Sequence, residues 1–142
     1  MTSPSEVEPP SIAPYLFYDD VGGAARFLEE AFGFTRIFES SMGGGEGDGG
    51  LQHAQLAFGN CKVMIGKTGQ GLRMVKRASA MDALHAGVYV YVPDVDGHCE
   101  RARKAGATIL LEPGDQPWGD RMYCAIDPEG QFWMFARTLA KA

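Results

Sequence analysis

Residues 87–106 read GVYVYVPDVDGHCERARKAG, and this stretch decides the fold of the chain. Valine and tyrosine alternate over residues 88–92, a pattern typical of a β-strand, in which successive side chains point to opposite faces. Asp94 then opens a helix that we expect to run to about Lys104, and Gly106 ends it. The stretch therefore predicts a strand that passes directly into a helix.

An earlier stretch has the same order of signals. Residues 12–33 read IAPYLFYDDVGGAARFLEEAFG, which predicts a strand over 12–18 and, from apolar residues at helical spacing, a helix over 21–32. From Asp20 to the closing Gly33 is 13 residues, and from Asp94 to Gly106 is 12. The chain therefore contains an internal repeat, which we expect to be a structural duplication.

Three more strand-like segments follow each strand–helix pair. They cover residues 35–39, 51–58 and 61–66 in the first half, and 108–111, 121–126 and 131–136 in the second. Each half is thus a βαβββ module. We predict an α+β fold with two such modules in tandem, each a curved mixed sheet with a helix on its convex face.

The modules are expected to form a single domain over residues 11–142, because one module alone could not bury both faces of its sheet. Module one covers 11–66, a linker covers 67–85 and module two covers 86–137, after a disordered tail over 1–10. The linker, with several basic residues, is expected to be solvated; a lid or dimer arm is the alternative. Residues 43–50, six of them glycine, are expected to be a mobile loop.

Composition argues against several classes of protein. The 142 residues are 45% hydrophobic and 22% charged, as in a globular domain. A formal net charge of -5 argues against nucleic acid as a partner, and no apolar run approaches the ~20 residues that a membrane span needs. Cys61, Cys99 and Cys124 are widely spaced and suggest neither a disulfide framework nor a zinc knot. We therefore expect a cytoplasmic protein without nucleic-acid or membrane partners.

Three short motifs add a family resemblance. They are Ala31-Phe32-Gly33-Phe34, Asp127-Pro128-Glu129-Gly130 before the last strand, and Pro117-Trp118-Gly119-Asp120-Arg121. Together with the duplication, they resemble the vicinal-oxygen-chelate superfamily, which contains glyoxalase I, bleomycin-resistance proteins and extradiol dioxygenases. The resemblance spans residues 12–136, and the 117–121 motif looks like the bleomycin-resistance-like or PhnB-like subgroup.

In metal-dependent members of that superfamily, each module supplies one ligand from its first strand and one from its last, usually His, Glu or Gln. By position, these four places fall on Ala13, Met64, Gly87 and Met134. Alanine and glycine offer no side-chain ligand, and a thioether suits copper(I) rather than zinc, nickel, manganese or iron. We therefore expect neither a metal ion nor another cofactor. His85, two residues before Gly87, is expected to lie outside the site.

Strand alternation predicts which side chains face a ligand. If Ala13 and Gly87 face the cavity, so do the aromatic residues two and four positions further along, while Val88 and Val90 face the helix. Alternation on the inner strands, together with Trp118 on a loop, completes an aromatic pocket with a few polar groups. The predicted ligand-binding residues are Tyr15, Phe17, His53, Gln55, Met64, Tyr89, Tyr91, Trp118, Arg121, Tyr123, Phe132 and Met134.

Several of these residues have a second interpretation. The tyrosines are equally consistent with core or interface packing, and Trp118 with a cover for the core. His53 is a weak candidate for a general base, because a lone histidine is more often structural. Arg121 suits a ligand carboxylate or phosphate, but a salt bridge to Asp115 or Asp120 is equally consistent.

The resemblance implies a metal-free protein that binds a small molecule, similar to drug-sequestering bleomycin-resistance proteins, with an aromatic drug or metabolite as ligand. The alternative is a lyase or dioxygenase-type enzyme of the same superfamily, either metal-free or with an atypical metal site, and a dimeric scaffold without a ligand is a third. We also expect a homodimer, because relatives commonly build their cavities where modules of two chains meet and because exposed sheet edges favour burial.

Overall fold

The structure is a computed structural model that describes residues 12–41, 50–69, 75–83 and 86–140. The expected tail and most of the expected glycine loop lie outside the described residues. Module one contains β1 (Tyr15–Tyr18), α1 (Val21–Phe32), β2 (Thr35–Ser40), β3 (His53–Phe58) and β4 (Cys61–Lys67). A short 3-10 helix, η3 (Ala78–Ala80), lies in the linker. Module two contains β5 (Gly87–Tyr91), α2 (Val95–Lys104), β6 (Thr108–Asp115), β7 (Asp120–Ile126) and β8 (Phe132–Thr138).

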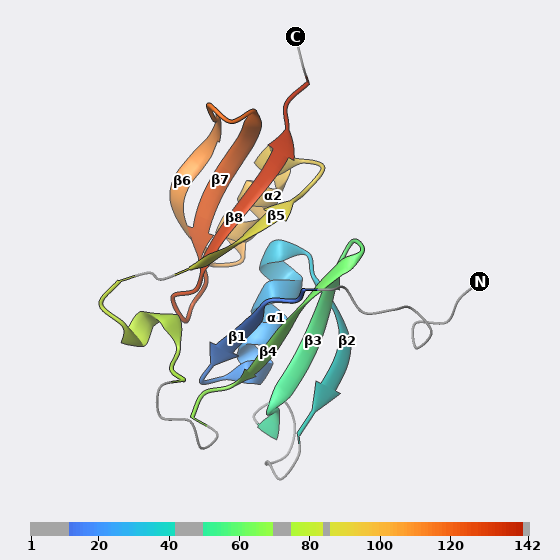
Figure 1. Ribbon diagram of the computed structural model, residues 1–142, viewed down its shortest axis with the longest axis vertical. Coiled ribbons are helices and arrows are strands. Elements are labelled where there is room, and N and C mark those ends of the chain that lie inside the picture. Colours follow the sequence, from blue (N-terminus) through green and yellow to red (C-terminus); the bar gives the residue numbers. More distant parts are fainter. Residues whose placement is uncertain (1–11, 42–49, 70–74, 84–85, 141–142) are drawn as a thin grey trace, which may run out of the picture.

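The two modules have the same topology, which confirms the predicted α+β duplication. Their strand orders are β1-β4-β3-β2 and β5-β8-β7-β6, with the first and last strands of each module parallel and the other neighbours antiparallel. The registers also match, because Tyr15 lies opposite Met64 and Tyr89 lies opposite Met134. Each helix lies across one face of its own sheet (Figure 1). Neither helix is long and apolar enough to cross a membrane; this applies to the described residues.

Both helices begin at the predicted aspartates. The Asp20 side chain accepts a hydrogen bond from the backbone N of Gly23, and Asp94 accepts one from Gly97. A Cβ atom at either glycine would lie 2.3 Å from an oxygen of its capping carboxylate, so glycine leaves room for this cap. Gly33 ends α1 in the left-handed conformation, with φ 81°.

The main hydrophobic core lies between the sheets and their helices and contains residues of both modules. Phe32 of module one packs against Trp133 and Phe135 of module two with tilted rings, Phe34 packs edge-on against Trp133, and all four are buried. Val88 and Val90 pack against this core, as alternation predicts.

Module two also closes the C-terminal end of α1. The Arg101 guanidinium donates to the carbonyl oxygens of Glu29 and Glu30, and His98 Nε2 lies 2.8 Å from the carbonyl oxygen of Phe32. These donors satisfy carbonyl groups that the end of a helix otherwise leaves unpaired.

The buried carboxylate of Asp127 joins the two modules. Its Oδ2 accepts from the Tyr18 hydroxyl at 2.6 Å and from Trp133 Nε1 at 3.1 Å, while Oδ1 accepts from the backbone N of Glu129 and Gln131. Burial raises the pKa of Asp127, and the hydrogen bonds from Tyr18 and Trp133 oppose that rise. Glu129 then accepts from the backbone N of Asp19 and Asp20, which fastens the β7–β8 turn to the start of α1.

The described part of the linker is mostly exposed to solvent, and it contacts the same turn. Arg77 forms an ion pair with Asp19 at 2.9 Å, and the backbone N of Ser79 donates to the carbonyl oxygen of Glu129. The backbone of Ser79 lies so close to Gly130 that a Cβ there would fall 2.8 Å from the Ser79 nitrogen. The linker therefore takes part in the contact between the modules.

Replacing Asp127 with alanine is expected to lower the free energy of unfolding by about 3 kcal/mol or more, because four donors would lose a charged acceptor inside the protein. Urea denaturation followed by circular dichroism measures this. Asp96→Ala is the matched control, since Asp96 also accepts two hydrogen bonds but is exposed, and exposed ion pairs contribute little. Equal losses in the two variants would contradict the role assigned to Asp127.

Candidate functional site

Each sheet turns one face away from its helix, and we call this its open face. On module one, strand pairing places Tyr15 and Gln55 on either side of Met64, and Phe17 and His53 on either side of Gly66. Residues that lie opposite each other in a sheet share a face, so these predicted side chains lie together. Phe38, opposite Gln55, joins them, and its ring lies 6.0 Å from that of His53.

A chain of hydrogen bonds crosses the open face of module one. Lys62 Nζ donates to Gln55 Oε1 at 2.9 Å, so the Gln55 amide nitrogen is left to face His53 Nε2 at 3.1 Å. Lysine has only donors, and this sets the direction of the whole chain. His53 then holds its proton on Nδ1 and donates it to the Tyr15 hydroxyl, 3.0 Å away. The Tyr15 hydroxyl proton is therefore available to a ligand.

His53 is less suited to be a general base than its residue type suggests. Partial burial, together with the positive charge of Lys62, lowers its pKa, which keeps the ring neutral at pH 7. Both ring nitrogens are already engaged, one by Gln55 and one by Tyr15. Its role in this geometry is to position the Tyr15 hydroxyl.

The open face of module two is built around a buried acid. Tyr89 and Tyr91 both donate to Asp120 Oδ2, at 2.7 and 3.0 Å, and Trp118 Nε1 donates to the Tyr89 hydroxyl at 3.2 Å. Burial raises the pKa of the Tyr89 phenol, and the hydrogen bond to Asp120 raises that of Tyr91. The rest of the face is a small apolar cluster of Met122, Cys124, Phe132, Met134 and Ala136.

Sequence reasoning missed the roles of Asp120 and Lys62. Asp120 entered only as a possible partner of Arg121, although it is two residues before Met122 and so shares its face. Lys62 lies two residues before Met64 on the same strand, in the same relation. That alternation was a usable signal, but their hydrogen-bond partners lie on other strands.

Two predicted pocket residues lie on the opposite, helix-covered face of module two. Tyr123 is 0% exposed in the main core, with its hydroxyl on His98 Nδ1. Arg121 forms ion pairs with Asp96 at 2.8 Å and with Asp115 at 3.2 Å. The pair with Asp115 is one of the two salt bridges that were the alternative to ligand binding by Arg121. The predicted placement of these two residues on the ligand face is wrong, because the register sets Cys124, not Tyr123, opposite Met134.

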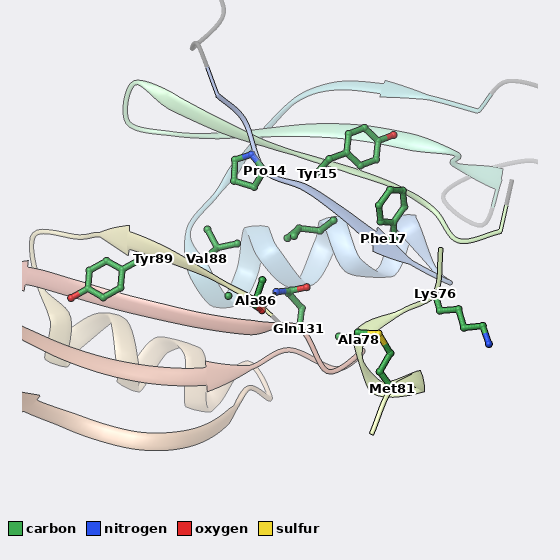
Figure 2. Close-up of a pocket in the computed structure, with 12 residues that line it drawn as sticks. Pro14, Tyr15, Phe17, Lys76, Ala78, Met81, Ala86, Val88, Tyr89 and Gln131 are labelled. Carbon is green, nitrogen blue, oxygen red and sulfur yellow. Dashed lines mark hydrogen bonds between the residues drawn. The ribbon is translucent and has the colours of Figure 1, made fainter. Parts of the chain in front are cut away.

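A cavity of about 480 Å³ lies between β1 and β5, at the junction of the modules. Figure 2 shows Tyr15 and Phe17 on one side, Tyr89 on another and linker residues Lys76 and Met81 on a third. The hydroxyl groups of Tyr15 and Tyr89 point away from each other (Figure 2). The complete lining is Pro14, Tyr15, Leu16, Phe17, Lys76, Ala78, Met81, Ala86, Gly87, Val88, Tyr89 and Gln131.

A second cavity, of about 540 Å³, is lined by Tyr89 and Tyr91 of β5, by the β3–β4 turn and by Lys62 of β4. The two cavities share Tyr89. The structure thus brings Tyr15, Phe17 and Tyr89 to one cavity, and Tyr89 and Tyr91 to the second. His53 and Gln55 are not among the lining residues of either; His53 bonds Tyr15, and Gln55 bonds His53 and Lys62. Trp118 is 62% exposed, beside Tyr89.

The residues at the four positions of a superfamily metal site do not fit a divalent metal ion. Ala13 and Gly87 carry no donor atom, and Met64 and Met134 offer thioethers, which are soft ligands. Among the residues that the structure describes, no three His, Cys, Asp or Glu side chains are grouped closely enough to hold a metal ion. His85 lies outside the described residues.

Comparisons with known proteins agree with this architecture. The family described as Glyoxalase/Bleomycin resistance protein/Dioxygenase superfamily matches residues 10–135. The uncharacterized protein Mb0911c of Mycobacterium bovis is 32% identical over 132 residues, 92% of this chain and 84% of the relative. TioX from Micromonospora sp. ML1 has a similar structure, with a TM-score of 0.70 and 32% identity over 92% of this chain and 99% of TioX. A glyoxalase/bleomycin resistance protein/dioxygenase from Nocardioides shares the fold, with a TM-score of 0.61 and 20% identity over 96% of this chain and 88% of that one.

The hydrogen-bond chain on module one predicts how His53 titrates. His53 is expected to have a pKa below its ordinary value, and Lys62→Met is expected to raise it, because a nearby positive charge disfavours the protonated ring. Titration of the imidazole proton resonances by NMR measures both values. Lys104→Met on α2 is the control and should leave the His53 pKa unchanged. An unchanged pKa in Lys62→Met would show that Lys62 does not act on His53.

Proposed function

Since the chain belongs to the glyoxalase/bleomycin resistance protein/dioxygenase superfamily, we propose that it binds a flat small molecule, without a metal ion, in the cavity between β1 and β5. The observation that carries this proposal is that Tyr15, Phe17 and Tyr89 all line one cavity of about 480 Å³. Its size is in the range of ligand pockets, and its lining is mainly apolar with a few polar groups.

The polar groups around the cavity suggest how a ligand would be oriented. Lys76 and Gln131 reach it from the linker and from the β7–β8 turn. Aromatic rings supply most of the contact, and each stacked pair contributes about 0.5–1.5 kcal/mol beyond burial. An aromatic drug or metabolite with a hydrogen-bond acceptor suits these contacts.

The alternative, a lyase or dioxygenase-type enzyme with an atypical metal site, rests on family membership. The chemistry of the four side chains at the metal positions argues against a divalent metal ion there. His53, the candidate base, has both ring nitrogens engaged. A binding protein therefore agrees better with the side chains on the open faces.

We also propose that the protein is a homodimer whose open faces meet those of a second copy. Large aromatic side chains are unusually exposed there: Phe38 is 52% exposed and Tyr91 is 58% exposed. Such exposed apolar groups on sheet faces are typical of interaction surfaces. A partner over these faces would also narrow the openings of both cavities.

Planar heteroaromatic compounds, screened as a panel, are expected to raise the melting temperature, because a ligand specific to the folded state stabilises it by RT ln(1 + [L]/Kd). Tyr89→Ala and Tyr15→Ala should each weaken binding of a stabilising compound by about 2- to 10-fold, in line with the loss of one aromatic contact. Thermal shift followed by calorimetric titration measures both effects.

Lys104→Ala serves as the control for these variants, because Lys104 is exposed at the end of α2 and lines neither cavity. Lys76 does not serve as a control, since it lines the cavity. Binding should also survive EDTA. Loss of binding on chelation, restored by one equivalent of a divalent metal, would overturn the metal-free proposal and favour the enzyme.

Analytical ultracentrifugation at tens of micromolar is expected to give twice the chain mass of 15.3 kDa. Phe38→Lys should shift the protein toward monomer, because it would bury a charge in the proposed interface. Glu100→Lys, on the solvent side of α2, should sediment as the unmodified protein does. A monomer at these concentrations would exclude the homodimer.

A further inference from the structure

The open face of module two carries an aromatic corner with an acid behind it. The rings of Tyr89 and Tyr91 lie 5.5 Å apart at an interplanar angle of 62°, so they form two walls rather than a stack. The Trp118 indole is tied to the Tyr89 hydroxyl through its Nε1. We propose that Tyr89, Tyr91, Trp118 and Asp120 form a receptor for a quaternary ammonium group, an assignment that rests on the proposed function and names the charge of its ligand.

Among the described residues, the side-chain partners of Asp120 in this corner are neutral. Asp120 is 5% exposed, and both of its tyrosine partners are neutral donors. Arg121, the neighbouring cation, is turned to the other face of the sheet by Asp96 and Asp115. Within the described residues, Asp120 forms no ion pair with a Lys, Arg or His side chain. A buried carboxylate without a cationic partner gains when a ligand cation comes close.

The geometry favours a cation that has no N–H donors. Asp120 Oδ2 already accepts hydrogen bonds from two phenol hydroxyl groups. We therefore expect Asp120 to attract a ligand cation through the tyrosine rings rather than through a direct salt bridge. Donation to a carboxylate makes each phenol oxygen and ring more electron-rich, and cations bind over the faces of such rings. A quaternary ammonium group loses no hydrogen bonds in this position, whereas a primary ammonium or guanidinium group would leave its donors unsatisfied.

Module one provides an internal contrast. Tyr15 occupies the position equivalent to Tyr89, since each lies opposite a methionine of the last strand. The Tyr15 hydroxyl lies at the end of a chain of hydrogen bonds that begins at the donor Lys62. The Tyr89 hydroxyl instead donates to the acid Asp120. The two open faces therefore have opposite electrostatic character, and we infer that only module two attracts a cation.

A charged and a neutral probe of the same shape test this. Choline and 3,3-dimethyl-1-butanol differ in the charge of the central atom, so the comparison separates charge from size. Choline should bind at least about 5-fold more tightly. Binding should change the fluorescence of Trp118, which is exposed, while the second tryptophan, Trp133, is fully buried. Titration by NMR or fluorescence gives both dissociation constants.

Two variants locate the effect. Asp120→Asn keeps an oxygen that can accept from the tyrosines but removes the charge, and should weaken choline binding about 5- to 10-fold while leaving the neutral probe unchanged. Tyr91→Leu should weaken choline binding to a similar extent. Because Tyr91 is 58% exposed, we expect this variant to fold, and it tests the receptor if Asp120→Asn does not fold. Ile37→Ala, an exposed apolar change in module one, is the control.

Equal affinity for the two probes, or choline binding that survives both variants, would overturn the receptor assignment. If neither probe binds while neutral planar compounds do, the assignment is wrong and the proposed function stands. If neither probe nor any planar compound binds, both are wrong.

Discussion

The buried carboxylate of Asp127 is the interaction on which the rest of the structure depends. It accepts from Tyr18 of module one and from Trp133 of module two, residues that stand 109 and 6 positions away in the chain. Four donors compensate the cost of burying this charge. The carboxylate fixes β1 against the β7–β8 turn, and residues of β1 and β5, the first strands of the two modules, line the same cavity.

The two modules share one backbone topology, but the side chains on their open faces differ. Tyr15 and Tyr89 occupy equivalent positions, yet the first accepts a hydrogen bond from His53 and the second donates one to Asp120. The difference follows from one donor-only residue, Lys62, and one acceptor-only residue, Asp120.

Most of the fold could be predicted from alternation, helix caps and the internal repeat. Helix α1 begins and ends at the predicted residues, and the valines of β5 face the core. Of the predicted ligand-binding residues, Tyr15, Phe17 and Tyr89 line one cavity, whereas Arg121 and Tyr123 lie on the helix-covered face of their sheet. Strand β7 has apolar residues on both faces, so its sequence contains no signal that chooses between them.

The sequence by itself determined the elements, the duplication and the residue types at the metal positions, because these depend on neighbours along the chain. Tertiary structure decided which face of β7 is open, what Asp120 and Lys62 bind, and that the linker docks beside the cavity. These features depend on register and on contacts between distant residues. The period of a strand predicts which of its side chains share a face. Only its pairing with other strands decides whether that face is covered by the helix or is the open face.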